Sequence, residues 1–143
     1  MKSSKFKFIE IKKGMTASLN VKITNDDVNN FVELTGDRNP LHVDRDFGKK
    51  STFKKNVVHG FLTTSYVSTL VGMLLPGENG LILSATFDFI MPIFEDDEIL
   101  IVGKVDEISK SSHTFNMLLS ITRNDKLLVR GSLLVKVGEN GHY

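Results

Sequence analysis

The densest polar stretch of the chain places a carboxylate and an imidazole five positions apart, at Asp37 and His42. Pro40 lies between them, disfavours a helical conformation at Asn39 and removes a backbone donor, so the chain must bend there. A bend could bring both side chains to one side, where histidine carries a proton near neutral pH and the carboxylate orients a water. An Asx turn, in which Asp and Asn only cap backbone groups, accounts for the same residues. Spacing alone is therefore weak evidence of catalysis.

Gly60 is a second candidate for chemistry, because it follows His59 at the start of a long apolar stretch. A glycine lets a ligand approach the backbone closely. Its N–H at a helix N-terminus would stabilise developing negative charge, such as that on the oxygen of an enolate-like thioester. A glycine needed only for packing against a sheet explains this position equally well. For His59 we expect a structural hydrogen bond rather than catalysis.

Helical patterns surround these residues. Thr24 is a candidate N-cap followed by acidic residues, and Gly36 is a plausible C-terminal stop, which predicts a helix between them. Residues 37–56 are polar and predict a long irregular connection, of a kind that is usually functional. From 57 to 75 the chain is almost continuously apolar or small, which predicts a helix inside the protein that ends at Pro76 and Gly77.

The second half of the chain predicts strands. Apolar residues alternate at 81–89, and β-rich segments follow at 99–105, 114–122 and 127–137, with an earlier strand at roughly 16–23. The later segments are separated by short turn-like links, such as residues 110–112 and 123–125, which favour antiparallel neighbours. We therefore expect an α+β fold in which an antiparallel sheet of about five strands curls around the apolar helix. Because such a sheet has exposed edges, we also expect a homodimer, with a sheet that continues across the interface.

Composition excludes several classes of function. The length of 143 residues suits a single domain over 1–143, and a net charge of +1 argues against nucleic-acid binding. Without cysteine there is no thiol nucleophile, and the four histidines lack metal-site spacing, so we expect no metal and no cofactor. No apolar run approaches the roughly 18 residues of a membrane span, and no targeting signal is convincing, so we expect a cytoplasmic protein.

The motifs together resemble a known family. The residues that carry the resemblance are Phe31-Val-Glu-Leu-Thr-Gly-Asp37-Arg-Asn39-Pro40-Leu41-His42-Val-Asp44, then Phe53, Val58-His59-Gly60, Phe89-Ile-Met-Pro92-Ile-Phe, Asp97 and Val129-Arg-Gly131. This pattern, over about residues 13–137, is similar to the signature of the MaoC-like, (R)-specific enoyl-CoA hydratases. The resemblance implies a hot-dog fold and a hydro-lyase of fatty acid metabolism that hydrates trans-2-enoyl-CoA or dehydrates (R)-3-hydroxyacyl-CoA.

The resemblance also assigns roles. Asp37 and His42 would form a dyad that holds the reacting water, and the Gly60 N–H would bind the thioester carbonyl. Asn39 would brace the turn of the dyad, and Ser68 falls where related enzymes place a serine near the site. It implies an acyl-CoA substrate, or an acyl-carrier-protein thioester, and a homodimer or dimer of dimers. Chain length, carrier, pathway and the identity of the base stay open.

Two further features bear on this assignment. Lysines between the dyad and Gly60 could bind the phosphates of coenzyme A, although such clusters are usually only solvated: Lys49, Lys50, Lys54 and Lys55. Asp96 stands where the family usually has a turn glycine, and we expect the turn to survive because aspartate tolerates left-handed backbone.

Two alternative functions stay open. A thioesterase on the same fold would place an acidic residue on or near the central helix, and residues 57–75 contain none. A non-catalytic acyl-CoA-binding module would be expected to lose Asp37 or His42, and the chain has both.

Overall fold

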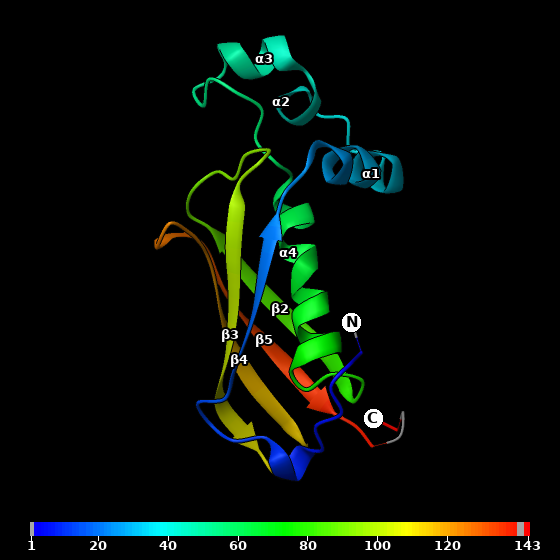
Figure 1. Cartoon of the computed structure of the whole chain (residues 1–143). Coiled ribbons are helices and arrows are strands. Elements are labelled where there is room, and N and C mark those ends of the chain that lie inside the picture. Colours follow the sequence, from blue (N-terminus) through cyan, green and yellow to red (C-terminus); the bar gives the residue numbers. More distant parts are fainter. Residues whose placement is uncertain (1, 140–141) are drawn as a thin grey trace.

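The computed structural model describes residues 2–139 and 142–143, so residues 1, 140 and 141 of the predicted domain lie outside the described part. Within that part, five strands form one antiparallel sheet in the order β1-β3-β4-β5-β2 (Figure 1). The strands are β1 (Thr16–Lys22), β2 (Gly80–Phe89), β3 (Glu98–Ser109), β4 (Thr114–Arg123) and β5 (Lys126–Val137). The predicted α+β architecture is confirmed, and β3 runs four residues beyond its predicted end at 105.

The turns that join the later strands use the residues that sequence reasoning assigned to them. Asn124 and Asp125 link β4 to β5 with φ of 49° and 61°, the pair of positive values that a tight two-residue hairpin requires. Asp96, before β3, also has a positive φ, of 68°. The expectation that the turn survives with aspartate in place of the usual glycine is confirmed.

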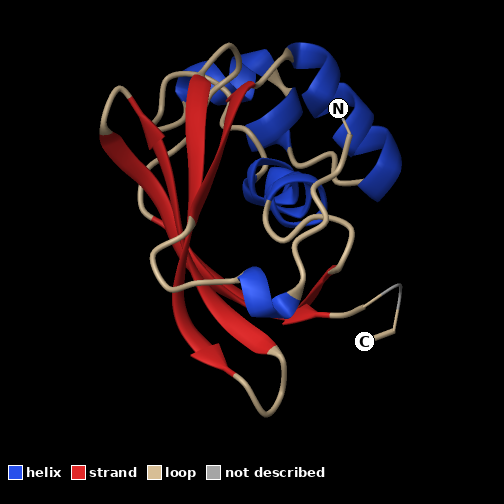
Figure 2. Cartoon of the chain, turned by 60° about the horizontal axis from the view of Figure 1, so that its bottom comes forward, coloured by secondary structure: helices blue, strands red, loops and turns tan. Residues whose placement is uncertain are grey.

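The central helix α4 (Gly60–Thr69) continues as a π-helical turn, η2 (Leu70–Leu74), and lies across the concave face of the sheet (Figure 2). Leu70 packs closely on Gly103 of β3: a Cβ added to Gly103 would lie 2.6 Å from the Leu70 Cδ2 atom. The sheet wrapped around this helix is the expected hot-dog architecture. The helix begins three residues later than predicted, because the Val58 N–H donates to the Ile93 carbonyl and so stays extended.

One face of α4 is exposed in the single chain. Phe61 is 73% exposed, and Ser65 and Ser68 are also exposed, whereas Leu62 and Val67 are buried. The prediction of a helix inside the protein is therefore wrong for this face. The segment carries little charge on any side, so its pattern could not reveal which side would lack a covering element.

Short helices cluster beyond the N-terminal end of α4 (Figure 1). They are α1 (Asn25–Thr35), α2 (Pro40–Val43) and α3 (Arg45–Lys50), and a 3-10 turn, η1 (Phe8–Glu10), precedes β1. The Thr24 hydroxyl accepts the Asp27 N–H at 3.2 Å, and the Asp27 carboxylate accepts the Thr24 N–H at 2.7 Å, so the predicted cap is confirmed. The predicted stop is confirmed as well, since Gly36 ends α1 with φ of 76°.

Residues 37–56 are not an irregular connection, which corrects the prediction. Pro40 is the first residue of α2, and the Asn39 side chain accepts the Leu41 N–H at 3.0 Å. Asp44 caps α3 in the same way, accepting the Asp46 N–H at 2.8 Å. Helices this short are set by their caps rather than by apolar periodicity, so the pattern did not predict them. No helix of the described residues is long and apolar enough to cross a membrane.

Candidate active site

Asp37 and His42 meet at the N-terminal end of α4. Asp37 follows the glycine that ends α1, and His42 lies in α2. One potential ligand atom from each of Asp37, His42 and the neighbouring His59 lies within 4.8 Å of the other two. The bend predicted at Pro40 therefore does bring the carboxylate and the imidazole together.

His42 is oriented by a backbone carbonyl. Its Nδ1 atom lies 2.6 Å from the Val57 carbonyl oxygen, which can only accept a hydrogen bond. Nδ1 must therefore carry the proton, and the neutral ring presents its lone pair at Nε2. That nitrogen is free to accept a proton from a water.

The Asp37 carboxylate serves the turn with only one of its oxygens. Oδ1 accepts the Asn39 N–H at 3.1 Å, as in an Asx turn. Oδ2 lies 3.8 Å from His59 Nε2, and the side chain is half exposed. The capping role and a role in chemistry are therefore compatible, because the second oxygen can still hold a water. Asn39, predicted to brace this turn, makes two hydrogen bonds there. Its N–H donates to Asp37 Oδ1, and its side-chain oxygen accepts the Leu41 N–H at the start of α2.

His59 is almost fully buried, with 2% of its surface exposed. Its Nε2 donates to the Asp37 carbonyl oxygen at 3.1 Å, so the predicted structural hydrogen bond is confirmed. The ring lies 3.9 Å from the His42 ring, centroid to centroid, with 30° between their planes. Burial lowers the pKa of His59 and outweighs the opposing effect of its hydrogen bond to the Asp37 carbonyl, which favours the neutral ring.

Gly60 is the first residue of α4, where a backbone N–H has no partner within the helix. A groove of about 500 Å³ borders it and continues to His42. Apart from His42, Gly60 and Thr63, the groove is lined by apolar side chains: Leu41, Phe53, Val57, Val58, Phe61, Phe89, Ile90, Met91, Pro92, Ile93 and Val129. A Cβ added at Gly60 would lie 2.8 Å from the Phe89 ring, so the glycine is also closely packed.

Of the predicted site residues, His42 and Gly60 line this groove, whereas Asp37, Asn39, Ser68 and the four lysines do not. Ser68 is exposed, about two turns along α4 from Gly60, and does not line the groove of the single chain. Its role near the acyl chain stays a prediction.

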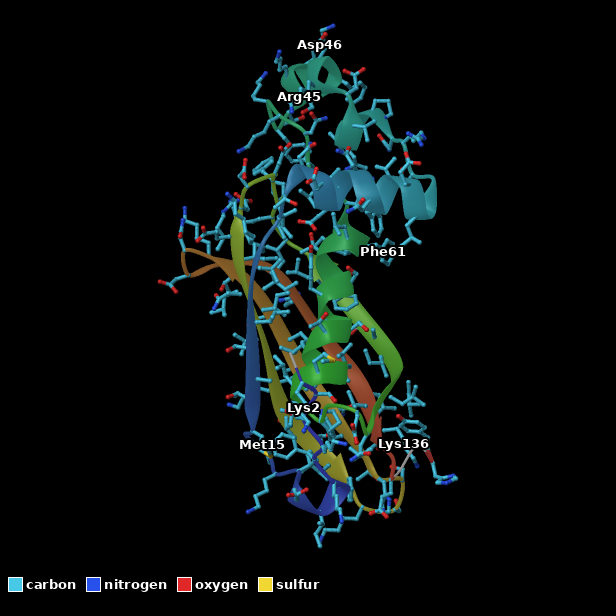
Figure 3. All side chains as sticks on the ribbon, turned by 45° about the vertical axis from the view of Figure 1, so that its right-hand side comes forward. Lys2, Met15, Arg45, Asp46, Phe61 and Lys136 are labelled. Atoms are coloured by element: carbon cyan, nitrogen blue, oxygen red, sulfur yellow. The ribbon has the colours of Figure 1, made fainter. Side chains whose placement is uncertain are left out.

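The lysines lie at the end of the molecule that carries α3, where Figure 3 marks Arg45 and Asp46. A hollow of about 370 Å³ is lined there by Arg45, Lys49, Lys54 and Lys55, together with Asn56, Phe94, Glu95 and Asp96. Lys50 is not among its lining residues. The hollow is thus basic on one side only, since it also contains two carboxylates.

Asn56 supports the site in a way that sequence reasoning missed. Its side-chain amide donates to the carbonyl oxygens of Leu41 at 2.9 Å and Asp44 at 2.8 Å, and so joins α2 to the start of α3. An asparagine within a polar stretch of sequence does not indicate such contacts. The Val57 carbonyl that orients His42 is equally invisible, because a main-chain group has no sequence signature.

The cluster of Asp37, His42 and His59 also has donor types suited to a divalent metal. One nitrogen of each histidine already donates to a carbonyl, and His59 would have to give up its bond to Asp37 to bind an ion there. We therefore assign no metal to this site.

Comparison with known proteins gives consistent matches. A family model described as "MaoC like domain" matches residues 7–124. The chain is 30% identical over 130 residues to a 3-hydroxybutyryl-CoA dehydratase of Methylorubrum extorquens, covering 91% of this chain and 83% of the relative. It is 31% identical over 125 residues to an (R)-specific enoyl-CoA hydratase of Aeromonas caviae, covering 87% and 93%.

Solved structures agree with these matches. The structure of an (R)-hydratase of Aeromonas caviae involved in PHA biosynthesis superimposes with a TM-score of 0.85 at 30% identity, covering 89% of this chain and 97% of that one. An R-hydratase of Pseudomonas aeruginosa gives a TM-score of 0.89 at 24% identity, covering 96% and 89%, which supports the fold alone.

Proposed function

Because the chain belongs to the family of MaoC-like domains, we propose that it is a hydro-lyase acting on acyl thioesters. It adds water to trans-2-enoyl-CoA to give (R)-3-hydroxyacyl-CoA, or catalyses the reverse dehydration. The observation that carries this proposal is the approach of Asp37 to His42, which lines an apolar groove that also borders Gly60. The relatives named 3-hydroxybutyryl-CoA dehydratase and (R)-specific enoyl-CoA hydratase support the same reaction class.

The reaction follows from the donors and acceptors at the site. A water held between Asp37 Oδ2 and His42 Nε2 attacks C3 of the enoyl group and gives up a proton to the pair. Electrons move from the double bond to the thioester oxygen, which the Gly60 N–H and the positive end of α4 stabilise. C2 then takes the proton back from the pair, which completes the addition of water and restores Asp37 and His42.

The substrate class follows from the surroundings of the pair. The acyl chain lies in the groove, where apolar side chains from β2 and the residues after it form one wall. A phosphate-bearing carrier such as coenzyme A suits the basic side of the hollow at Lys49, Lys54 and Lys55. An acyl-carrier-protein thioester would reach the same groove through its pantetheine arm.

The protein acts as a homodimer, or a dimer of dimers, formed through β2. This strand is at one edge of the sheet, and its residues Leu83 and Phe89 are 50% and 52% exposed. An edge strand with large exposed apolar residues is a template for pairing with a second copy. Light scattering after gel filtration tests this: Leu83→Lys should yield monomers. The matched control Leu118→Lys, at a residue 48% exposed on β4, should remain dimeric. A monomeric wild-type protein would contradict the proposal.

The assay that tests the function follows crotonyl-CoA spectroscopically. We expect loss of the conjugated enoyl thioester without release of free thiol, and a product that chiral analysis identifies as (R)-3-hydroxybutyryl-CoA. Release of thiol would instead make the protein a thioesterase. Binding of crotonyl-CoA and of longer enoyl-CoA substrates without turnover would make it a non-catalytic acyl-CoA-binding module.

A further inference from the structure

The site is built from two segments, residues 37–42 and residues 57–60. Two histidines join these segments by hydrogen bonds that run in opposite directions. His42, from the first segment, donates through Nδ1 to the Val57 carbonyl of the second at 2.6 Å. His59, from the second segment, donates through Nε2 to the Asp37 carbonyl of the first at 3.1 Å. The two rings lie against each other, tilted by 30°. We call this pair of residues, with its two bonds, the histidine clasp.

The position of His59 in α4 gives no reason for a histidine. It is the N-cap residue, where Ser, Thr, Asp and Asn are favoured because their side chains accept a helix N–H. His59 makes no such bond, and its side chain is turned toward Asp37 instead. The stability of the helix therefore does not account for this side chain.

The surroundings of His59 also fix its proton. Nε2 faces a carbonyl oxygen and must carry a hydrogen, which leaves the lone pair on Nδ1. Within the described part of the chain that Nδ1 atom is buried and has no hydrogen-bond partner. The Phe31 ring of α1 packs against it, with 5.0 Å between the ring centroids, and the titratable groups that face it are Asp37 and His42. The low pKa that burial causes is consistent with this single, neutral form.

We propose that His59 is a positioning residue: through the clasp it fixes Asp37 and His42 relative to each other and to the Gly60 N–H. The next residue in the chain is Gly60, so one side chain links all three groups of the site. The inference rests on the proposed hydration, in which these groups must act on one water and one thioester. A displacement of about 1 Å in such an arrangement can cost on the order of 100-fold in rate.

Two substitutions separate the parts of this role. His59→Phe keeps an aromatic ring against His42 and removes the donor to Asp37. His59→Gln keeps a donor near the Nε2 position and removes the ring. We expect His59→Phe to lower kcat for crotonyl-CoA by roughly 10- to 100-fold with KM within about threefold. His59→Gln should stay within about fivefold of the wild type. A merely structural side chain would not give this rescue by glutamine.

The result that overturns the proposal is wild-type kcat in a folded His59→Phe variant, or a His59→Gln variant that loses as much kcat as the phenylalanine variant. Should His59→Phe fail to fold, imidazole tautomers measured by nitrogen NMR on the wild-type protein decide the matter. We expect His59 neutral with the proton on Nε2 at pH 7, and His42 with the proton on Nδ1 when neutral. A proton on His59 Nδ1, or a charged His59, would overturn the clasp.

The tautomer measurement needs no turnover, so the two proposals can fail separately. A neutral, Nε2-protonated His59 in a protein without hydratase activity would contradict the proposed function and leave the hydrogen bond to Asp37 standing. An active hydratase with His59 protonated on Nδ1 would contradict the clasp alone.

Discussion

Replacing Gly60 with alanine separates the two explanations of this glycine, ligand approach and packing. The added Cβ would lie 2.8, 3.0 and 3.3 Å from three atoms of the Phe89 ring. Carbon atoms prefer about 3.5–4.0 Å, so the ring must retreat by roughly 0.5–1 Å. Phe89 is half exposed and can turn away, so we expect an unfolding free energy within about 1 kcal/mol of the wild type, below the usual 1–3 kcal/mol of overpacking.

The effect of Gly60→Ala on activity should be much larger. The methyl group lies at the first N–H of α4, where the thioester oxygen has to approach. Loss of one donor of this kind typically costs about 100- to 1,000-fold in rate, so we expect kcat/KM for crotonyl-CoA to fall by roughly 100-fold. Gly72→Ala is the matched control, because a Cβ at that position meets nothing within 4 Å. It should leave kcat/KM unchanged.

A double-mutant cycle with Phe89→Ala completes the experiment. If the methyl group blocks the thioester, Gly60→Ala should cost the same factor, within about threefold, with and without Phe89→Ala. If the glycine only makes room for Phe89, removing the ring should abolish the cost. Recovery of activity in the double variant, relative to Phe89→Ala alone, would refute the assignment of Gly60 to the thioester oxygen.

Three further variants test the surroundings of the site and the cap of α1. The double variant Lys54→Gln, Lys55→Gln should raise KM for crotonyl-CoA severalfold more than KM for crotonyl-pantetheine, which lacks the nucleotide phosphates. Equal effects on both substrates would mean that these lysines do not bind the carrier. The Thr24 hydroxyl holds the pKa of Asp27 below its usual value, so the stability from this cap is present above the normal carboxyl pKa and is lost as the pH falls through the lowered pKa. Urea unfolding across acidic pH should therefore show a weaker pH dependence in Asp27→Asn, and an unchanged slope would contradict this. Asn56→Ala removes the amide that donates to the Leu41 and Asp44 carbonyls. We expect the unfolding free energy to fall by about 1 kcal/mol and kcat to fall as well. An unchanged kcat would show that these hydrogen bonds do not support the site.

The fold was predictable because its signals are local and periodic. The alternation of apolar residues at 81–89 predicts a strand, and the turn-forming residues at 123–125 predict a hairpin. Thr24 and Gly36 mark the ends of α1 through capping chemistry that needs no tertiary contact. By contrast, α2 and α3 have too few residues to show an apolar period. Their capping residues, Asn39 and Asp44, are equally common in loops.

The site was predictable only in part. The types and spacing of Asp37 and His42, with Pro40 between them, gave the pair and its bend. The contacts that orient the pair could not be read, because they join His42 to the Val57 carbonyl and Asn56 to the carbonyls of another segment. The exposure of Ser68 could not be predicted either, because a helix with little charge on any face has no pattern that identifies its exposed side.

The measurement that tests the central claim most directly is kcat of Asp37→Asn with crotonyl-CoA. Asparagine keeps an Oδ1 acceptor for the Asn39 N–H, so the turn should persist, and binding of the saturated analogue butyryl-CoA should be unchanged. We predict that kcat falls by about 100- to 10,000-fold, the range that a general acid or base contributes. Near-wild-type kcat in this folded variant would remove Asp37 from the chemistry and contradict a reaction in which Asp37 and His42 activate one water.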